Sequence, residues 1–186
     1  KARILVKKFP HDYIFYNALG MALMNISKYD ESLEVLNKAI RLGENNIHVL
    51  NNLGLVHGYL ANYQKASKYY ERALKIKPNF LNALINLSQL KEKLNLNNEA
   101  IEILKIALKH YPEDYFLHYV VATIYQFIGD FKNSHLHFKK SLSINPNATE
   151  IYRLMSMTKK YQKNEKDIEI LKDKINDKNL SKIKKM

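Results

Sequence analysis

Apolar residues recur at intervals of three and four positions along most of the chain, as in Leu33, Leu36, Ala39 and Ile40. This spacing gathers apolar side chains on one face of an α-helix, whereas a half-buried strand would alternate apolar and polar residues. The sequence also holds only five glycines and four prolines. The chain is therefore predicted to be all-α.

The apolar stripes repeat with a period of 34 residues. If slot 1 of the frame is placed at Tyr13, slot 8 holds a small residue each time: Gly20, Gly54, Ser88, Ala122 and Ser156. Slot 32 holds Pro10, Glu44, Pro78, Pro112 and Pro146, and therefore all four prolines of the chain. Such a fixed period indicates an array of units, each of which buries its apolar face against the next.

Each 34-residue unit is predicted to be a hairpin of two helices. A small residue in slot 8 of the first helix lets the two helices approach closely. The second helix has small residues in slot 20 as well: Ser32, Ala66, Ala100 and Ser134. Bulky residues in slots 17 and 24, such as Tyr63 with Tyr70, are expected to fill the space between neighbouring hairpins. Asn62, Asp130 and Asn164, all in slot 16, suit the N-cap of the second helix, and proline in slot 32 ends it.

The second repeat carries a recognisable motif, Asn52-Leu53-Gly54 followed by Tyr63-x-x-Ala66-x-x-x-Tyr70-x-x-Ala73 and Pro78. This motif resembles the tetratricopeptide repeat. The resemblance implies a right-handed α-solenoid with a concave groove lined by the first helices. We predict the second helix of a preceding repeat at 1–12, full repeats at 13–46, 47–80, 81–114 and 115–148, a degenerate fifth repeat or capping helices at 149–176, and a basic tail at 177–186. Because the pattern is already under way at residue 1, we expect a piece of a longer protein.

Composition narrows the functional classes. The chain has no cysteine, which excludes disulfides, thiolate zinc sites and a cysteine nucleophile. The formal net charge of +12 is uneven, with ten lysines and five acidic residues from Lys159 onward. We interpret this basic segment from Lys159 onward as solvated surface and do not expect nucleic-acid binding. We find no signal peptide and no apolar run long enough to span a membrane, which favours a cytoplasmic location.

Candidate catalytic chemistry is sparse. No GxGxxG or GxxxxGK[ST] motif is present. His135 and His137 are two residues apart on a predicted helix, whereas a helical pair of metal ligands needs a spacing of three or four. Carboxylate pairs such as Glu31 with Glu34 belong to outer helix faces. We therefore predict no enzyme activity, no cofactor and no metal for these residues.

Ligand binding is expected in the groove, because slots 2, 5, 6, 9, 12 and 13 of tetratricopeptide first helices tend to face it. Among the residues in these slots, the candidate ligand contacts are six amides, Asn17, Asn51, Asn52, Asn82, Asn86 and Gln89, and two aromatic residues, Phe116 and Tyr119. A primary amide donates and accepts hydrogen bonds, so a row of them can hold an extended peptide, similar to the asparagine ladder of O-linked N-acetylglucosamine transferases. The aromatic residues could accept an apolar side chain of the ligand. The alternatives are that the asparagines are only consensus residues and that the aromatic residues pack on the fifth repeat.

Two other functions stay open beside a protein- or peptide-binding scaffold. One rests on four short segments and one methionine, which resemble the junction that follows the repeats in bacterial tetratricopeptide–sulfotransferase fusions: Tyr152-Arg153-Leu154-Met155-Ser156, Lys159-Lys160-Tyr161, Asn164-Glu165-Lys166-Asp167-Ile168, Asn179-Leu180-Ser181 and Met186. This resemblance implies a larger transferase that uses phosphoadenosine phosphosulfate. The other is a structural array that assembles end to end into homo-oligomers, with Ala2, Leu5 and Val6 at one contact face.

Overall fold

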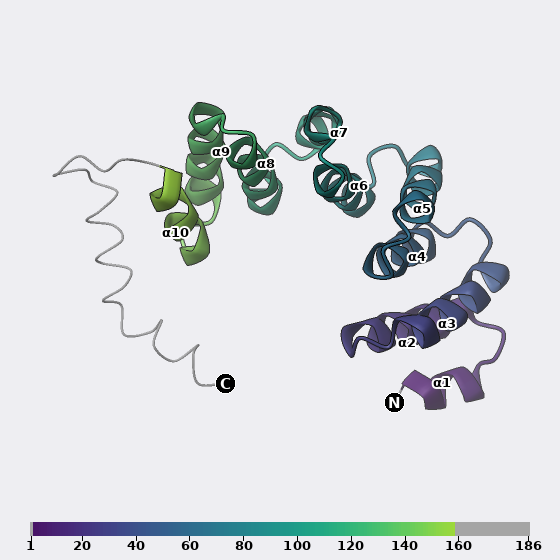
Figure 1. The fold of residues 1–186 in the computed structure, drawn as a ribbon. Helices are drawn as coiled ribbons and strands as arrows, with labels where there is room; N and C mark the ends of the chain where they lie inside the picture. The colour runs from purple at the N-terminus through teal and green to yellow at the C-terminus, as the bar shows by residue number, and fades with distance from the viewer. Residues whose placement is uncertain (1, 159–186) are drawn as a thin grey trace. The chain divides into compact units, whose positions relative to one another are not determined.

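The computed structural model describes residues 2–158, and all ten secondary-structure elements in that range are α-helices (Figure 1). They are α1 (Ala2–Lys8), α2 (Tyr13–Asn25), α3 (Tyr29–Leu42), α4 (Ile47–Tyr59), α5 (Tyr63–Ile76), α6 (Leu81–Lys93), α7 (Asn97–His110), α8 (Tyr115–Phe127), α9 (Phe131–Ile144) and α10 (Thr149–Thr158). The predicted all-α fold class is confirmed. No helix in this range combines the length and the apolar character needed to span a bilayer.

The helices form four hairpins, α2 with α3, α4 with α5, α6 with α7 and α8 with α9. Each hairpin turns through a residue with positive φ in slot 15, namely Ser27, Ala61, Asn95 and Gly129. Glycine adopts this left-handed conformation without a steric cost, whereas the other three residues adopt it despite their Cβ atoms. The shared turn gives each hairpin the same local geometry.

The side-chain caps before the second helices are less regular than the sequence predicted. The Asp130 carboxylate accepts a hydrogen bond from the backbone N–H of Asn133, as expected for a capping residue. Asn62 is the N-cap residue of α5, as predicted, but its side chain makes no capping hydrogen bond. Its φ of −83° and ψ of 61° are close to the −80° and 73° of Asp130, so the backbone conformation does not explain the difference. Asn164 lies outside the described residues.

Close packing within the hairpins depends on the small residues of slot 8. A Cβ atom added to Gly20 would lie 2.5 Å from Cγ of Leu36, and one added to Gly54 would lie 2.4 Å from Cε1 of Tyr70. The Ser32 hydroxyl donates a 2.7 Å hydrogen bond to the Gly20 carbonyl across the same interface. Slot 24 therefore fills space inside the hairpin, and Leu36 also joins an apolar cluster with residues of α4.

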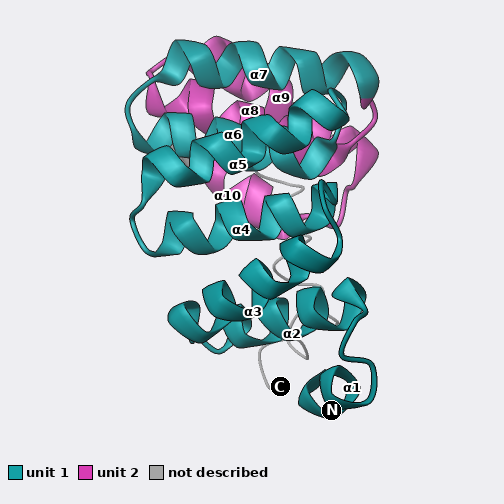
Figure 2. Ribbon diagram, turned by 90° about the vertical axis from the view of Figure 1, so that its right-hand side faces the viewer, with its two compact units in different colours: residues 1–110 teal, residues 111–186 magenta. Residues whose placement is uncertain are grey.

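The chain divides into two compact units, residues 1–110 (unit 1) and 111–186 (unit 2), coloured separately in Figure 2. In unit 1, α2 contacts α4 and α4 contacts α6, so these three first helices form a continuous surface, here called the first-helix face. The second helices α3, α5 and α7 lie on the other side of unit 1 (Figure 1). In unit 2, α10 packs on the hairpin of α8 and α9.

The two ends of the predicted array are described only in part. At the N-terminal end, α1 packs on α2, and Val6 lies against the first apolar cluster of unit 1. Leu5, which we predicted at a stacking face, is exposed. At the other end, α10 begins the predicted fifth repeat, and the rest of that repeat and the basic tail lie outside the described residues. The division into individual repeats and the end-to-end stacking stay predictions.

Candidate peptide-binding groove

Four of the predicted groove asparagines bond to one another in two pairs on the first-helix face. Nδ2 of Asn52 donates to Oδ1 of Asn17 over 2.8 Å, and Nδ2 of Asn86 donates to Oδ1 of Asn51 over 2.9 Å. Each pair joins slot 5 of one repeat to slot 6 of the next. The sequence predicted a row of amides but not that its members are each other's partners.

The pairs leave an uneven polar surface for a ligand. Asn51 and Asn52 are only 5% and 6% exposed, whereas Asn17 and Asn86 are half-buried. Nδ2 of Asn17 and Oδ1 of Asn86 have no hydrogen-bond partner within the described part of the chain. A ligand on this face would therefore meet a free donor at Asn17 and a free acceptor at Asn86.

The two remaining predicted amides lie further out on α6. Asn82 and Gln89 are exposed, and neither side chain forms a hydrogen bond with any residue in the range 2–158. Gln89 lies one turn after Asn86, so both amides face the same side of the helix. Asn86 and Gln89 consequently form the accessible polar edge of this part of the first-helix face.

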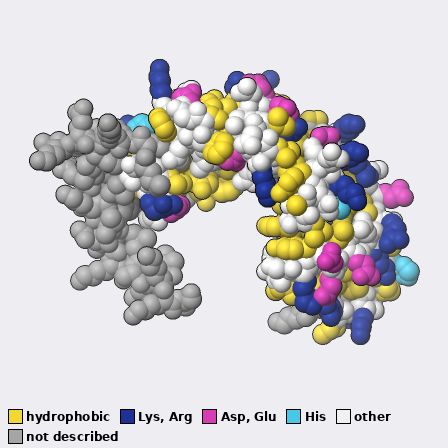
Figure 3. Space-filling view, viewed as in Figure 1, with side chains coloured by type: hydrophobic (Ala, Val, Ile, Leu, Met, Phe, Trp, Pro, Cys, Tyr) yellow, Lys and Arg dark blue, Asp and Glu magenta, His cyan; other side chains and the backbone are white. Residues whose placement is uncertain are grey.

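A hollow of about 170 Å³ lies beside these amides, between α4 and α6. Six of its lining residues occupy slots that the sequence assigned to the groove: Leu55, Gly58, Tyr59, Asn86, Gln89 and Lys93. A Cβ atom added to Gly58 would meet nothing within 4 Å, so the absence of a side chain there keeps the hollow open. Figure 3 shows apolar side chains gathered on this side of unit 1, over α2 and α4.

Tyrosines form the aromatic wall of the hollow. Tyr63 and Tyr70 from α5 and the 60% exposed Tyr59 line it. The Tyr59 ring stacks on Tyr29 at 5.0 Å, and Nζ of Lys93 lies 4.9 Å from the centre of the Tyr63 ring. Burial raises the pKa of the Tyr70 phenol, so its hydroxyl stays protonated and can donate a hydrogen bond. The sequence predicted that residues in slots 17 and 24 only pack between hairpins. It did not predict that Tyr63 and Tyr70, which occupy these slots, also line the hollow.

The two predicted aromatic site residues lie in unit 2, on α8. Phe116 is 43% exposed, and its ring stacks on Tyr119 with 5.6 Å between the ring centres. Tyr119 packs against the cluster that contains Ile151 and Met155 of α10. Tyr119 thus supports the contact with the fifth repeat, which was the alternative to ligand binding, while Phe116 keeps an open face.

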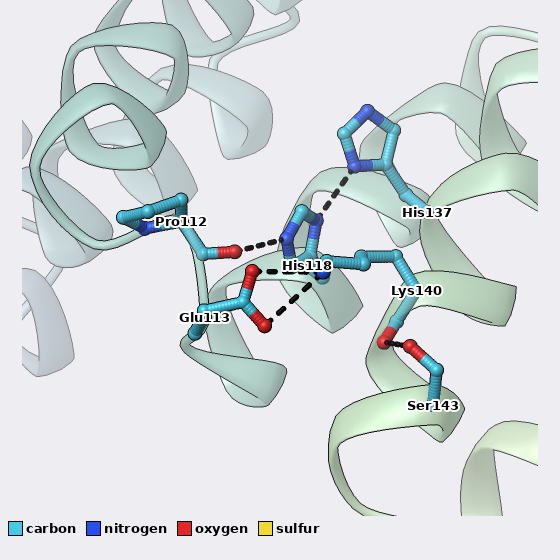
Figure 4. Close-up of polar contacts among 6 residues, drawn as sticks. All are labelled: Pro112, Glu113, His118, His137, Lys140 and Ser143. Carbon is cyan, nitrogen blue, oxygen red and sulfur yellow. Dashed lines mark hydrogen bonds and ion pairs between the residues drawn. The ribbon is translucent and has the colours of Figure 1, made fainter.

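A histidine pair, buried His118 and half-buried His137, lies elsewhere in unit 2 (Figure 4). His118 Nε2 lies 2.9 Å from the Pro112 carbonyl, which can only accept, so this nitrogen carries the proton. In the neutral form of His118, Nδ1 then accepts a hydrogen bond from His137 Nδ1, 3.0 Å away. Burial, and secondarily the neighbouring His118, lowers the pKa of His137 to about 4. Near pH 7 His137 is therefore a neutral donor.

Neither this pair nor its surroundings form a metal site. No three histidine, aspartate or glutamate residues in the described range are grouped so as to hold a metal ion. Beside the pair, Lys140 forms an ion pair of 2.8 Å with Glu113 (Figure 4). The sequence analysis compared His135 with His137, which lie on one helix. It missed the contact between His118 and His137 because these two residues come from the two different helices of a hairpin.

Comparisons with known proteins agree with this architecture. Tetratricopeptide repeat family models match residues 13–79, 60–120 and 117–148. Anaphase-promoting complex subunit 7 of Arabidopsis thaliana is 29% identical over 132 residues, which cover 70% of this chain and 24% of that protein. The chain spans less than a third of the length of the curated relatives it matches first.

Two solved structures are similar in fold. The Cut9–Hcn1 hetero-tetramer of the APC/C matches with a TM-score of 0.74 and 24% identity, over 84% of this chain and 32% of that one. YrrB, described as a TPR protein with an unusual peptide-binding site, matches with a TM-score of 0.64 and 18% identity, over 100% of this chain and 98% of that one. At these identities the likeness shows the fold alone. Because the three family matches together run from residue 13 to residue 148, the chain belongs to the tetratricopeptide repeat family.

Proposed function

We propose that this chain is a protein-interaction scaffold that binds an extended peptide segment on the first-helix face of unit 1. The observation that carries the proposal is the hollow between α4 and α6, because most of its lining comes from slots assigned to the groove on other grounds. It combines tyrosine and leucine side chains with the exposed amide of Gln89 and the half-buried amide of Asn86, whose Oδ1 has no partner in the described range. This mixture suits a ligand with an apolar side chain on a polar backbone.

The expected binding mode has one apolar anchor and a few backbone hydrogen bonds. An apolar or aromatic side chain of the ligand enters the hollow, where its burial contributes roughly 1.5–3 kcal/mol. Asn86 and Gln89 bond to the flanking backbone at about 1 kcal/mol each. Asn17 and Asn82 can bond further along the peptide, and Phe116 of unit 2 is proposed as a separate apolar contact for a ligand. We expect micromolar affinity, on the order of 8 kcal/mol, with the balance supplied by these outer contacts.

The relatives support this class of function. The matched Arabidopsis protein is a subunit of the anaphase-promoting complex, and a BBSome complex member of Caenorhabditis elegans is 29% identical to this chain over 152 residues. Both names describe components of multi-protein assemblies. YrrB is described as having a peptide-binding site on the same fold. Each of these properties belongs to the relative, and for this chain they favour protein binding over catalysis.

The test begins with peptides selected from a random library on the intact chain, followed by affinity measurement by fluorescence polarisation. Gly58→Leu is intended to fill the hollow, since a Cβ atom at this position meets nothing within 4 Å, and Gln89→Ala removes one exposed amide. We expect Gly58→Leu to weaken peptide binding at least tenfold and Gln89→Ala several-fold. Gln64→Ala is the matched control, because Gln64 is exposed on α5 and is not part of the hollow. Unchanged affinity in Gly58→Leu would show that the peptide binds elsewhere.

A larger sulfotransferase-type transferase and a self-assembling array are the alternative functions. A strand, phosphate-binding loop and helix encoded after Met186 would support the transferase. A molecular mass that rises with protein concentration in light scattering would support the array. The hollow and its amides favour the peptide-binding scaffold over both.

A further inference from the structure

We propose that unit 1 carries a second binding site, a basic pocket between α3 and α5 that takes an organic phosphate monoester. This site lies on the second-helix side and is separate from the peptide-binding hollow. The pocket measures about 490 Å³, within the range of about 300–1,000 Å³ typical of small-molecule sites. The proposal does not depend on the peptide-binding function.

The rim of the pocket carries three cations from α5. Lys65, Lys68 and Arg72 are spaced by three and four residues, which places them along one face of the helix. None of the three forms an ion pair within residues 2–158, and no carboxylate lines the pocket. Figure 3 shows Lys and Arg side chains along this edge of unit 1. Three like charges at this spacing repel one another, so a bound anion would relieve the repulsion.

The inner wall holds the groups that would orient the anion. The His57 and Tyr69 rings stack with 5.4 Å between their centres and 9° between their planes. The Arg72 guanidinium lies 5.9 Å from the centre of the Tyr69 ring, so the same aromatic surface positions it. A guanidinium held in place offers two parallel N–H groups, which match two oxygens of a phosphate.

His57 is the strongest sign that a ligand is expected there. The residue is 5% exposed, and its Nδ1 is buried without a hydrogen-bond partner. A proton on Nδ1 would bury an unpaired N–H, so the neutral ring keeps its proton on Nε2. Burial, and secondarily Lys65, lowers the pKa of His57, which favours this neutral form. His57 lines the pocket and no residue in the described range accepts a hydrogen bond from its Nε2, so we assign this N–H as a donor to the bound anion.

The donor set fits a phosphate monoester better than other anions. A monoester carries a charge of about −1.5 to −2 at pH 7 and three strong acceptor oxygens. The two lysines, the arginine, the His57 N–H and the Asn37 amide can supply donors to all three oxygens. The rest of the lining, Leu33 and the Tyr69 ring, offers apolar surface for the organic part of the ligand. A long nucleic acid would instead call for a basic stripe that extends beyond a single pocket.

The test uses phenyl phosphate as the probe in isothermal titration calorimetry with the whole chain. We expect saturable binding at least tenfold tighter than that of inorganic phosphate or phenylacetate. A variant with Lys65→Gln, Lys68→Gln and Arg72→Gln should weaken binding at least tenfold. The control variant with Lys109→Gln, Lys132→Gln and Lys139→Gln lowers the net charge equally at exposed positions on α7 and α9, outside the pocket, and should bind normally. His57→Phe keeps an aromatic ring beside Tyr69 but removes the N–H, and should weaken binding at least threefold.

Further arms identify the source of the phosphate. A phosphotyrosine peptide that binds more tightly than phenyl phosphate would assign the site to a phosphorylated partner, and weaker binding would assign it to a free metabolite. The proposal is overturned if phenyl phosphate does not saturate below 1 mM, or if the pocket and control variants lose binding equally. It is also overturned if only anionic phosphatidylserine vesicles bind, since that would indicate a membrane surface.

Discussion

Gly54 and Gly58 lie one helical turn apart on α4, yet their surroundings differ. The position of Gly54 is filled by the Tyr70 ring, which leaves no room for even a methyl group. Gly58 faces the open hollow and touches nothing where a Cβ atom would stand. Gly54 therefore allows the two helices of the hairpin to pack closely. Gly58 lowers the stability of the helix but leaves the hollow on the surface open.

Gly54→Ala and Gly58→Ala should consequently have opposite effects on stability. We expect Gly54→Ala to lower the free energy of unfolding by about 1–3 kcal/mol, because the methyl group would overpack the α4–α5 interface. Gly58→Ala should raise it by roughly 0.5–1 kcal/mol through helix propensity alone. Urea unfolding followed by circular dichroism measures both. Equal effects of the two substitutions would contradict this assignment.

The His118–His137 pair is expected to make unit 2 sensitive to acid. His137 has a pKa of about 4 in the folded chain, against about 6.5 when unfolded. Between these values the unfolded chain binds more protons, so the free energy of unfolding rises with pH. The stability linked to His137 is therefore fully present above pH 6.5 and is lost as the pH falls towards 4.

We expect this loss to be roughly 1–2 kcal/mol, less than the full pKa difference implies, because His137 is partly exposed and solvent screens it. Urea midpoints at pH 7.5 and 4.5 measure it. His137→Gln keeps a donor for His118 Nδ1 but does not titrate, so its midpoint should depend less on pH than that of the unsubstituted chain. Glu113, Lys140 and Tyr125 surround the pair in both the unsubstituted chain and the variant. Their contributions to the pH dependence therefore cancel when the two are compared. An identical pH dependence in the two would be evidence against a titrating His137.

Between neighbouring hairpins, the asparagine pairs tie together helices that belong to different repeats. The bond from Asn52 to Asn17 joins α4 to α2, and the bond from Asn86 to Asn51 joins α6 to α4. Because these amides are largely buried, removal of one partner leaves the other without its bond. The pairs thus set the register of adjacent first helices and, through it, the spacing of the amides that a peptide would meet.

A double-mutant cycle tests this coupling. We expect Asn17→Ala and Asn52→Ala to be non-additive in urea unfolding, with an interaction energy of about 1 kcal/mol. Asn17→Ala with Asn86→Ala is the control, since these residues are not bonded to each other, and should be additive within about 0.5 kcal/mol. Additivity in the bonded pair would mean that the contact contributes nothing to the register.

The molecule as a whole distributes its apolar core over the array. Three clusters, centred on Leu36, Leu50 and Tyr70, contain only residues of unit 1, and a fourth, centred on Phe138, contains only residues of unit 2. Arrays of this kind gain stability from each repeat and from each contact between neighbours. We therefore expect unit 1 to fold alone.

A fragment of residues 1–110 should remain helical and unfold cooperatively. We expect a lower urea midpoint than that of the whole chain, because a shorter array has fewer contacts between neighbouring repeats. Circular dichroism and the slope of the urea transition measure both properties. A broad transition without cooperativity would show that unit 1 depends on the rest of the chain for its fold.

The sequence predicted those contacts that depend only on a residue's position within one repeat. Slot 8 predicted the contacts of Gly20 and Gly54, and the groove slots predicted most of the hollow. What it missed lies between repeats or between the two helices of a hairpin. Asn52 and Asn86 share a slot, but their bonds run to slot 5 of the preceding repeat, an offset that a 34-residue alignment hides. His118 with His137, and the cations of α5 around His57, likewise combine residues that no single helix period connects.

The serial packing of unit 1 has a mechanical consequence. Because its hairpins contact chiefly the next hairpin along the chain, a pulling force on its two ends would pass through them one after another. Each 34-residue repeat that opens would release roughly 110–120 Å of extended chain, at about 3.3–3.6 Å per residue. We expect a scaffold built in this way to unfold under force one hairpin at a time. A partner bound to one hairpin could then stay bound while another hairpin unfolds.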